Sequence, residues 1–142
     1  MAKNTADAIW RGNLKEGEGH MALGKGAFEG AFTFHSRFED GEGTNPEELI
    51  GAAMAGCFSM QFSAFLHNNG IESESVEVHA SVELRPVDGA PTITKITLDT
   101  TVTAPGADES AVREQAEAAK EKCPVSRALG PVDKELNLTL NA

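Results

Sequence analysis

The sequence predicts an α+β fold whose elements follow the order βββ-α-ββ-α-α-β. Two observations support this class. Short alternating runs typical of strands occur in groups, before residue 40 and after residue 74, rather than one by one between helices. A long apolar segment without proline, residues 49–68, separates the two groups and predicts one long helix. The chain of 142 residues has the length of one ordinary domain, which we expect to span residues 1–142.

The first third of the chain predicts three short strands separated by glycine-containing turns, over residues 8–11, 20–23 and 28–38. The third strand has the clearest period, because its phenylalanines all occupy even-numbered positions. We expect this phenylalanine face to belong to the core. Arg37 falls on the opposite face of the same strand.

Residues 44–48, Thr-Asn-Pro-Glu-Glu, are typical of a helix start, with a capping side chain, an early proline and acidic residues near the positive end of the dipole. The helix predicted over residues 49–68 is apolar nearly all round, so we expect it to be buried on several sides. Small residues at positions 51–56 would allow a second helix to approach closely. Asn69 and Gly70 end the helix.

The second half of the chain completes the α+β pattern. Two longer β-branched runs, residues 75–84 and 92–102, predict an antiparallel pair of strands. An amphipathic helix then runs from Asp108 through Lys122, and Pro124 can begin a second short helix. Residues 135–140 alternate like a last strand.

Composition excludes several classes of partner. A formal net charge of -10, with the twelve basic residues scattered, argues against nucleic acid, because phosphate binding needs clustered Lys and Arg. The first ten residues have no basic region followed by an apolar stretch, and no uninterrupted run of about 18 apolar residues occurs. We therefore expect a cytoplasmic protein without a membrane segment. Two cysteines in such a chain are either inert buried thiols or redox groups.

Cys57 lies in the middle of the long predicted helix, where a free cysteine is often only a small apolar residue. A reactive cysteine must instead be a thiolate, which requires a cation or hydrogen-bond donors nearby. Arg37 is the leading candidate for that cation, although a solvated strand arginine fits the pattern equally well. Glu47 could orient the Arg37 guanidinium through a bidentate pair, or it could be a helix-capping acid. The pattern alone does not choose between these interpretations.

Helix geometry limits how these residues can meet. Ten residues of straight helix separate Glu47 from Cys57 by about 15 Å. If both belong to one site, either the helix is broken or a second subunit supplies one of them. Two antiparallel copies of this helix about a two-fold axis would place each Glu47 near the other chain's Cys57, which predicts an isologous dimer with two composite sites.

Cys123 lies at a predicted helix end beside Pro124, so we expect it to be better exposed than Cys57 and suited to the role of a resolving thiol. Its spacing of 66 residues from Cys57 matches no zinc or thioredoxin-like motif, and the four histidines occur singly on different elements. We expect no metal. Residues 19–26 imitate a phosphate-binding loop, but Gly26 replaces the Ser or Thr that would hold Mg²⁺, so we expect no nucleotide cofactor.

Several motifs together resemble the OsmC/Ohr family of hydroperoxide reductases. They are Arg-Phe-Glu at residues 37–39, Thr-Asn-Pro-Glu at 44–47, Cys57 ten residues after Glu47, and Cys-Pro-Val-Ser at 123–126. The Phe-Ser-Met run after Cys57 favours the OsmC branch. The resemblance covers nearly the whole chain and implies an intertwined homodimer, with antiparallel sheets around two central cysteine helices.

The resemblance also implies a reaction cycle. The Cys57 thiolate attacks a peroxide oxygen and becomes a sulfenic acid, Cys123 condenses with it to a disulfide, and a dithiol reductant reopens that bridge. Arg37 would stabilise the thiolate and hold the peroxide, and Glu47 would orient Arg37. The family implies organic hydroperoxides as preferred substrates over hydrogen peroxide, a lipoyl-bearing protein as reductant, and a role in oxidative and osmotic stress defence. Met54 and Gly56 depart from many relatives, which leaves substrate preference open.

Two other functions fit parts of the sequence. A non-enzymatic binding protein on the same fold could use its cysteines as a redox sensor, or not at all, but would not need Arg37 and Glu47 as well. A thiol-dependent hydrolase with Cys57 as acyl acceptor would need a histidine as general base. No histidine precedes His67 within the Cys57 helix.

Overall fold

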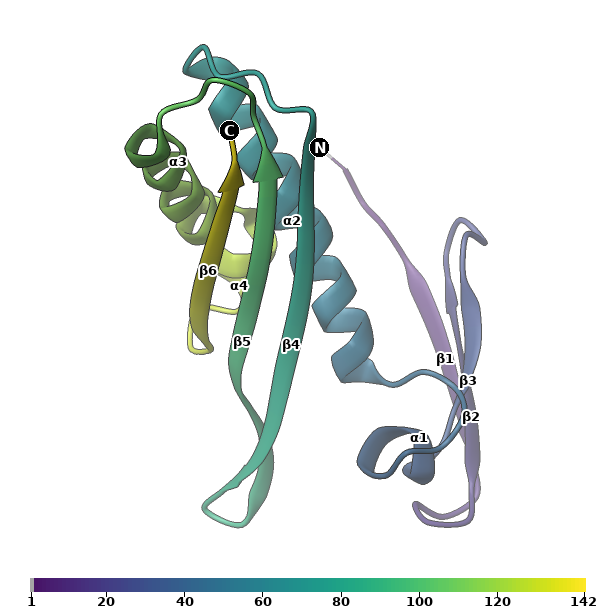
Figure 1. Ribbon diagram of the computed structural model, residues 1–142. Helices are drawn as coiled ribbons and strands as arrows, with labels where there is room; N and C mark the ends of the chain where they lie inside the picture. Colours follow the sequence, from purple (N-terminus) through teal and green to yellow (C-terminus); the bar gives the residue numbers. More distant parts are fainter. Residues whose placement is uncertain (1) are drawn as a thin grey trace. The chain divides into compact units, whose positions relative to one another are not determined.

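The computed structural model describes residues 2–142, and over this range its elements follow the order βββ-αα-ββ-αα-β (Figure 1). The α+β class is confirmed, with one short helix more than the sequence predicted. The chain forms two compact units, the first ending at Leu49 and the second running from Ile50 to Ala142. Each unit contains a three-stranded sheet.

The first unit is built on an antiparallel sheet in the order β1-β2-β3, with β1 at Ala6–Arg11, β2 at Glu18–Leu23 and β3 at Glu29–Phe32. Gly19 on the central strand pairs with both Trp10 and Phe32. A Cβ atom at Gly19 would lie 2.5 Å from the Phe32 ring. Glycine at this position therefore allows the Trp10 and Phe32 rings to meet across the strand, with centroids 5.3 Å apart.

The predicted strand over residues 28–38 is wrong beyond Phe32. Thr33 instead caps helix α1 (Phe34–Phe38) through a capping box, in which Thr33 Oγ1 accepts from the Ser36 amide and Ser36 Oγ accepts from the Thr33 amide. These local hydrogen bonds compete successfully with extension of the strand. The phenylalanine face is not a core face either, since Phe28 is 72% exposed. Arg37 accordingly projects from a helix rather than from a strand.

Helix α2 (Pro46–Asn68) begins where the sequence predicted, because Asn45 Oδ1 accepts from the Glu48 amide at 2.7 Å. By length and composition it could span a membrane, with a mean hydropathy of 1.6 over 18 residues, a test that a core helix of a soluble protein also passes. Four residues spaced one turn apart are fully buried: Met54, Phe58, Phe62 and Leu66. The other side is largely exposed, so the expectation of burial on several sides is wrong for the single chain.

The second unit pairs β4 (Ser75–Val87) with β5 (Ala90–Thr103) in antiparallel fashion, as predicted, and adds β6 (Asp133–Asn141) parallel to β5. The sequence did not predict the parallel pairing. It arises because the helices between β5 and β6 return the chain to the starting end of β5. These crossover helices are α3 (Glu109–Lys122), capped by Asp108, and α4 (Pro124–Ala128), both close to their predicted limits.

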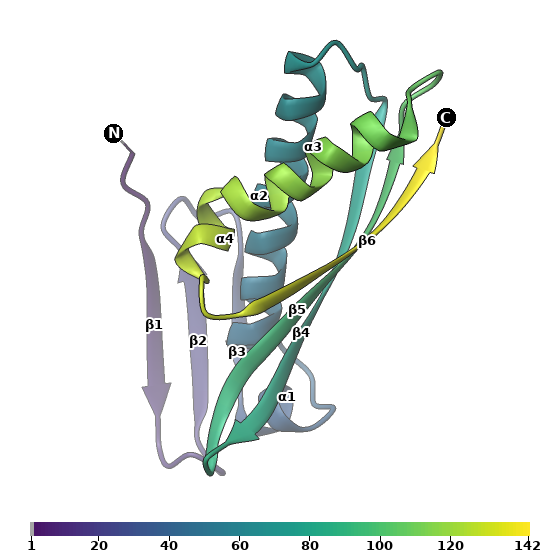
Figure 2. The ribbon, with the colours of Figure 1, turned by 90° about the vertical axis from the view of Figure 1, so that its left-hand side faces the viewer.

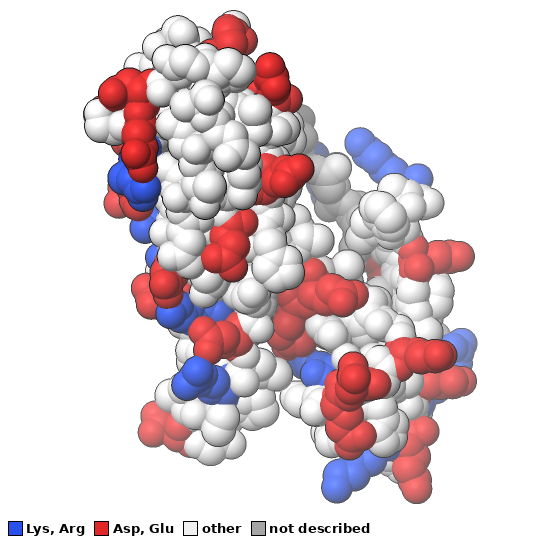
Figure 3. All heavy atoms as spheres, viewed as in Figure 1, with Lys and Arg blue, Asp and Glu red and all other residues white. Residues whose placement is uncertain are grey.

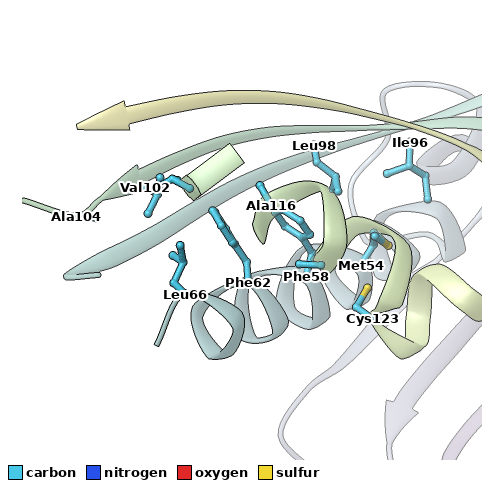
Figure 4. Packing of buried hydrophobic residues seen from close by; sticks show 12 residues of the cluster. Met54, Phe58, Phe62, Leu66, Ile96, Leu98, Val102, Ala104, Ala116 and Cys123 are labelled. Carbon is cyan, nitrogen blue, oxygen red and sulfur yellow. The ribbon is translucent and has the colours of Figure 1, made fainter. Parts of the chain in front are cut away.

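The core of the second unit lies between helices α2 and α3 and one face of the β4-β5-β6 sheet (Figure 2). Strand β5 contributes Ile96, Leu98 and Val102, and α3 contributes Val112, Ala116 and Ala119. Figure 4 shows these side chains together with the buried row of α2, and places Cys123 at the end of the cluster where Met54 lies. The core therefore brings the end of α3 against the middle of α2.

Candidate active site

The two cysteines, 66 residues apart in sequence, come together in the second unit. Cys57 projects from α2 and is partly exposed, whereas Cys123 is the residue that joins α3 to α4. Both belong to the same apolar cluster, and the Cys57 side chain is one of the groups that act directly on the Cys123 thiol. Both thiols are free. The packing of α3 on α2 has therefore placed two reduced cysteines next to each other.

The exposure predicted for Cys123 is wrong. Its position at a helix end is confirmed, since it is the last cap of α3 and the first cap of α4. Its side chain is nevertheless 0% exposed, while Cys57 is partly exposed. The extended backbone at Cys123, with φ -63° and ψ 141°, turns the chain between the two helices and leaves the thiol within the core.

Burial raises the pKa of the Cys123 thiol to about 11, because the low-dielectric core disfavours the thiolate. The backbone amide of Ser126, in the first turn of α4, opposes this shift. The neighbouring Cys57 thiol raises the pKa further, and the positive charge of Lys134 lowers it. Cys123 is therefore a protonated thiol near neutral pH, and its use as a nucleophile depends on the groups around it.

Arg37 and Glu47 form a close ion pair within the first unit. Arg37 Nη2 donates to Glu47 Oε1 at 2.7 Å, and Arg37 Nε lies 3.2 Å from both carboxylate oxygens. The Glu47 residue is only 8% exposed. The guanidinium also lies over the Phe38 ring, 5.2 Å from its centroid. This geometry selects the ion-pair interpretation of Glu47 over the capping one, and shows that Arg37 is not a solvated strand residue.

The loop between α1 and α2 holds this pair in place. Asn45 Nδ2 donates to the Ser36 carbonyl oxygen at 2.9 Å, and Ser36 Oγ donates to the Thr44 carbonyl oxygen at 2.8 Å. Ser36 is buried and adjacent to Arg37 in sequence. The Thr-Asn segment thus both starts α2 and ties it to the short helix that carries the arginine.

Helix α2 is continuous from Pro46 to Asn68, so the possibility of a broken helix between Glu47 and Cys57 is excluded. The offset of ten positions between them corresponds to about 15 Å along the helix axis. Two groupings of site residues thus occur in the structure, Arg37 with Glu47 and Cys57 with Cys123.

The histidines stand apart from both groupings. Three of them lie beside exposed carboxylates, His20 with Glu29, His35 with Glu39, and His67 with Glu72. His79 lies on the exposed face of β4. Within residues 2–142, no three His, Cys, Asp or Glu side chains are grouped as a metal site requires. Figure 3 shows acidic side chains spread over much of the drawn face, with basic ones among them.

Sequence reasoning missed Lys134 on strand β6. Its ammonium group donates to the carbonyl oxygens of Ser126, at 3.0 Å, and Leu129, at the end of α4. A signal was present in the sequence: Lys134 occupies the alternating face that otherwise carries Leu136, Leu138 and Leu140. A cation in an inward-facing row of leucines is unusual enough to single out.

Comparison with known proteins identifies the family to which the chain is similar. A family described as OsmC-like protein matches residues 39–137. Peroxiredoxin OsmC of Escherichia coli (strain K12) is 43% identical over 123 residues, which cover 86% of each chain. Organic hydroperoxide resistance protein-like 2 of Staphylococcus epidermidis is 31% identical over 102 residues, 71% of each chain.

Solved structures share the fold. The organic hydroperoxide resistance protein OhrB of Bacillus subtilis superposes with a TM-score of 0.72 at 29% identity, covering 95% of this chain and 98% of that one. An OsmC-like protein from Mycoplasma pneumoniae gives a TM-score of 0.77 at 16% identity, with 99% of each chain covered. The predicted OsmC-like architecture around a long cysteine-bearing helix is therefore confirmed.

Proposed function

The chain belongs to the OsmC family, and we propose that it is a two-cysteine peroxiredoxin that reduces organic hydroperoxides, and hydrogen peroxide more weakly. The observation that carries this proposal is the placement of two free cysteines in one cluster, Cys57 partly exposed and Cys123 buried beside it. A substrate can reach the first thiol, and the second is already in place to trap the oxidised product. Reduction of hydroperoxides in this way would serve oxidative and osmotic stress defence.

The reaction begins at Cys57. Its thiolate attacks the terminal oxygen of the hydroperoxide, the O–O bond breaks, and the leaving alkoxide takes up a proton to become an alcohol, or water when the substrate is hydrogen peroxide. Cys57 is now a sulfenic acid. Cys123 attacks its sulfur, a disulfide forms, and hydroxide leaves as water with the proton from Cys123. A dithiol reductant then opens the disulfide; we assign this role to a lipoylated protein.

Arg37 and Glu47 activate the first step in this proposal. Glu47 is a nearly buried carboxylate that binds the guanidinium through both oxygens, which fixes the orientation of Arg37. The Nη1 donors are not used by this pair, and they would contact the Cys57 thiolate and the peroxide. A cation and donors held in advance stabilise the charge that develops on the oxygens during O–O cleavage.

A homodimer completes the site in this proposal. Because α2 is continuous, Glu47 and Cys57 of one helix are separated by about ten residues of its length. Two antiparallel α2 helices would bring the Arg37–Glu47 pair of each chain to the Cys57 of its partner. The exposed side of α2 suits such packing, since it carries small residues at positions 52, 53, 56, 63 and 64. We propose that a second copy covers this side, that residues 1–142 act as one domain, and that the dimer is soluble and cytoplasmic.

Peroxide consumption by the purified protein with a dithiol tests the function directly. We expect turnover of cumene hydroperoxide to exceed that of hydrogen peroxide in the wild type. Cys57→Ser should abolish turnover, and Cys123→Ser should stop after one event per site unless a small thiol is added to reduce Cys57. Failure of the wild type to consume either peroxide, or full activity in Cys57→Ser, would refute the proposal and favour a binding protein.

A further inference from the structure

Lys134 is a charged residue near the Cys123 sulfur that has no role in the proposed mechanism. Lys134 lies on β6, a strand that the peroxidase residues do not use, yet its charge acts on the Cys123 thiol. It pairs in register with Ile96, a fully buried core residue of β5. Its row on β6 faces the core, because the exposed residues of the strand alternate with it. Strand β6 therefore carries the cation of Lys134 at a position where its alternating pattern predicts an apolar side chain.

The Lys134 ammonium is fixed in position by helix α4. It donates to the carbonyl oxygens of Ser126 and Leu129 at the end of this helix, and the Leu129 carbonyl oxygen also accepts from the Val132 amide at 3.0 Å. Cys123 caps the other end of this five-residue helix. The positions of the cation and the sulfur are therefore set by the same short element, and Lys134 cannot move far from Cys123 without losing both of its hydrogen bonds to α4.

Both disulfide steps place negative charge on Cys123. In closure, the Cys123 thiol loses its proton and its sulfur attacks the Cys57 sulfenic sulfur, releasing hydroxide that becomes water. In opening, one thiolate of a dithiol attacks a sulfur of the disulfide and displaces the other cysteine. The exposed sulfur is that of Cys57, and Cys123 is fully buried. The reductant therefore attacks Cys57, and Cys123 departs as the thiolate; the second thiol of the reductant then frees Cys57.

We propose that Lys134 is a positioning residue for Cys123, whose thiolate it stabilises when the disulfide closes and again when it opens. This inference rests on the proposed function for its catalytic consequence. The cation offsets part of the cost of forming a thiolate in a buried place, where no water can solvate it. The remaining groups that act on Cys123 are the Ser126 amide of α4 and the Cys57 thiol of α2.

Other charges near this region do not replace Lys134. Lys120, Glu121, Arg127 and Asp133 line a surface pocket of about 530 Å³ together with Ser126 and Lys134. They include equal numbers of acids and bases, and Lys120 pairs with Glu117 at 2.9 Å. None of them is among the groups that shift the Cys123 pKa. Lys134 is the cation among those groups, its effect is the smallest of them, and its position rests on its hydrogen bonds to α4, the helix that Cys123 caps.

A simpler role for Lys134 would be to cap α4 alone, and two substitutions separate the roles. Lys134→Gln retains amide donors for the α4 carbonyl groups but removes the charge, whereas Lys134→Arg retains both. Lys95→Gln serves as a matched control, since Lys95 pairs with Glu135 on the neighbouring strand and is not among the groups acting on Cys123. Circular dichroism of each variant verifies that it is folded.

The first measurement uses a Cys57→Ser background, so that it does not depend on peroxidase activity. We follow formation of the Cys123 thiolate by its ultraviolet absorbance as a function of pH, a readout that needs no reagent to enter the core where this thiol is buried. Lys134→Gln should move the midpoint of this transition to higher pH and lower the thiolate fraction on the order of threefold below the midpoint, since the neutral side chain no longer stabilises the thiolate. Lys134→Arg and Lys95→Gln should match the parent. A parent-like midpoint in Lys134→Gln would overturn the proposal.

The second measurement uses chains that retain both cysteines. After one equivalent of cumene hydroperoxide, dimedone trapping reports the lifetime of the Cys57 sulfenic acid, and excess dithiol then reports reopening of the disulfide. Lys134→Gln should slow closure and opening, each about threefold, with sulfenic acid formation unchanged. Unchanged closure and opening would overturn the proposal. If the wild type forms no sulfenic acid, the proposed function fails, and the pH titration of the Cys123 thiolate still decides the effect of Lys134 on Cys123.

Discussion

The two units of the chain bury different kinds of side chain. Within residues 2–142, the fully buried large apolar side chains all belong to the second unit, from Met54 to Cys123. In the described part of the first unit, the buried side chains are those of Ser36 and Glu47. The first unit therefore holds its functional residues by hydrogen bonds and an ion pair, whereas the second holds its cysteines by apolar packing.

The two units also differ in how much apolar surface they leave exposed. Most of the exposed large apolar side chains belong to the first unit: Ile9, Leu14, Leu23, Phe28 and Phe38. An apolar hollow of about 220 Å³ lies there as well, lined by Met21, Leu23, Phe28 and Leu49 among others. A soluble protein rarely leaves such surface uncovered. We therefore expect the first unit to depend on a partner for its stability, and the second to depend on its own core.

The largest expected effect is on stability, at the core of the second unit. Phe58→Ala removes a fully buried ring that stacks on Phe62, with centroids 5.6 Å apart. We expect the free energy of unfolding to fall by about 3–5 kcal/mol. Leu14→Ala, at a turn residue that is 61% exposed and does not line the apolar hollow, should change it by less than about 1 kcal/mol.

Urea unfolding at one protein concentration measures both changes, with concentration fixed because a dimer unfolds by mass action. Equal losses for Phe58→Ala and Leu14→Ala would show that the two units do not differ in the way the burial pattern indicates.

The next effect concerns the ion pair of the first unit. Glu47→Gln keeps the shape of the side chain but removes the charge that orients Arg37 through three hydrogen-bonded contacts. We expect kcat/KM for cumene hydroperoxide to fall about tenfold, because the guanidinium loses its fixed orientation. Glu48→Gln is the matched control, since Glu48 is the adjacent exposed carboxylate and bonds to Thr44. A larger loss in Glu48→Gln than in Glu47→Gln would contradict the assigned role.

The smallest effect is a pH dependence located at Cys123. Its pKa is raised by burial from the ordinary 9.0 to about 11, so the unfolded chain releases this proton at lower pH than the folded chain does. This thiol therefore leaves the free energy of unfolding unchanged below about pH 9 and lowers it as the pH rises from about 9 to about 11. Cys123→Ala should remove on the order of 1 kcal/mol of this alkaline loss, and Cys57→Ala should retain most of it. Urea titrations at about pH 8 and pH 10 measure the difference; equal slopes in wild type and Cys123→Ala would rule it out.

The sequence predicted those elements that have local start and stop signals. Asp108 and Pro124 mark the beginnings of α3 and α4, and Asn45 marks that of α2, because each acts on backbone groups within a few residues. The failed strand after Phe32 had an equally local cause: the period-two pattern of phenylalanines concealed the capping box of Thr33 and Ser36. The alternating pattern indicated a strand and the capping box indicated a helix. The hydrogen bonds of the capping box determined the structure.

The site was predictable in its residue types but not in its contacts. The sequence around Glu47 fits both a capping box and an ion pair with Arg37. The position of α1, which carries Arg37, decides between these two interpretations. A helix end indicates where the backbone of Cys123 turns, but not whether its thiol faces the core. Lys134 could have been found from its register with the leucines of β6, although its carbonyl partners on α4 depend on the parallel pairing of that strand.

The central claim is that the two units form one site only across two copies, and mixed dimers test it most directly. Arg37→Met and Cys57→Ser chains, each inactive alone, are unfolded together, refolded and assayed for cumene hydroperoxide reduction. In a composite dimer, the intact Arg37 of one chain meets the intact Cys57 of the other, so about a quarter of wild-type activity should return at a random mixture. Activity no higher than the sum of the two parents would contradict the claim, because it would place Arg37 and Cys57 in the same chain's site.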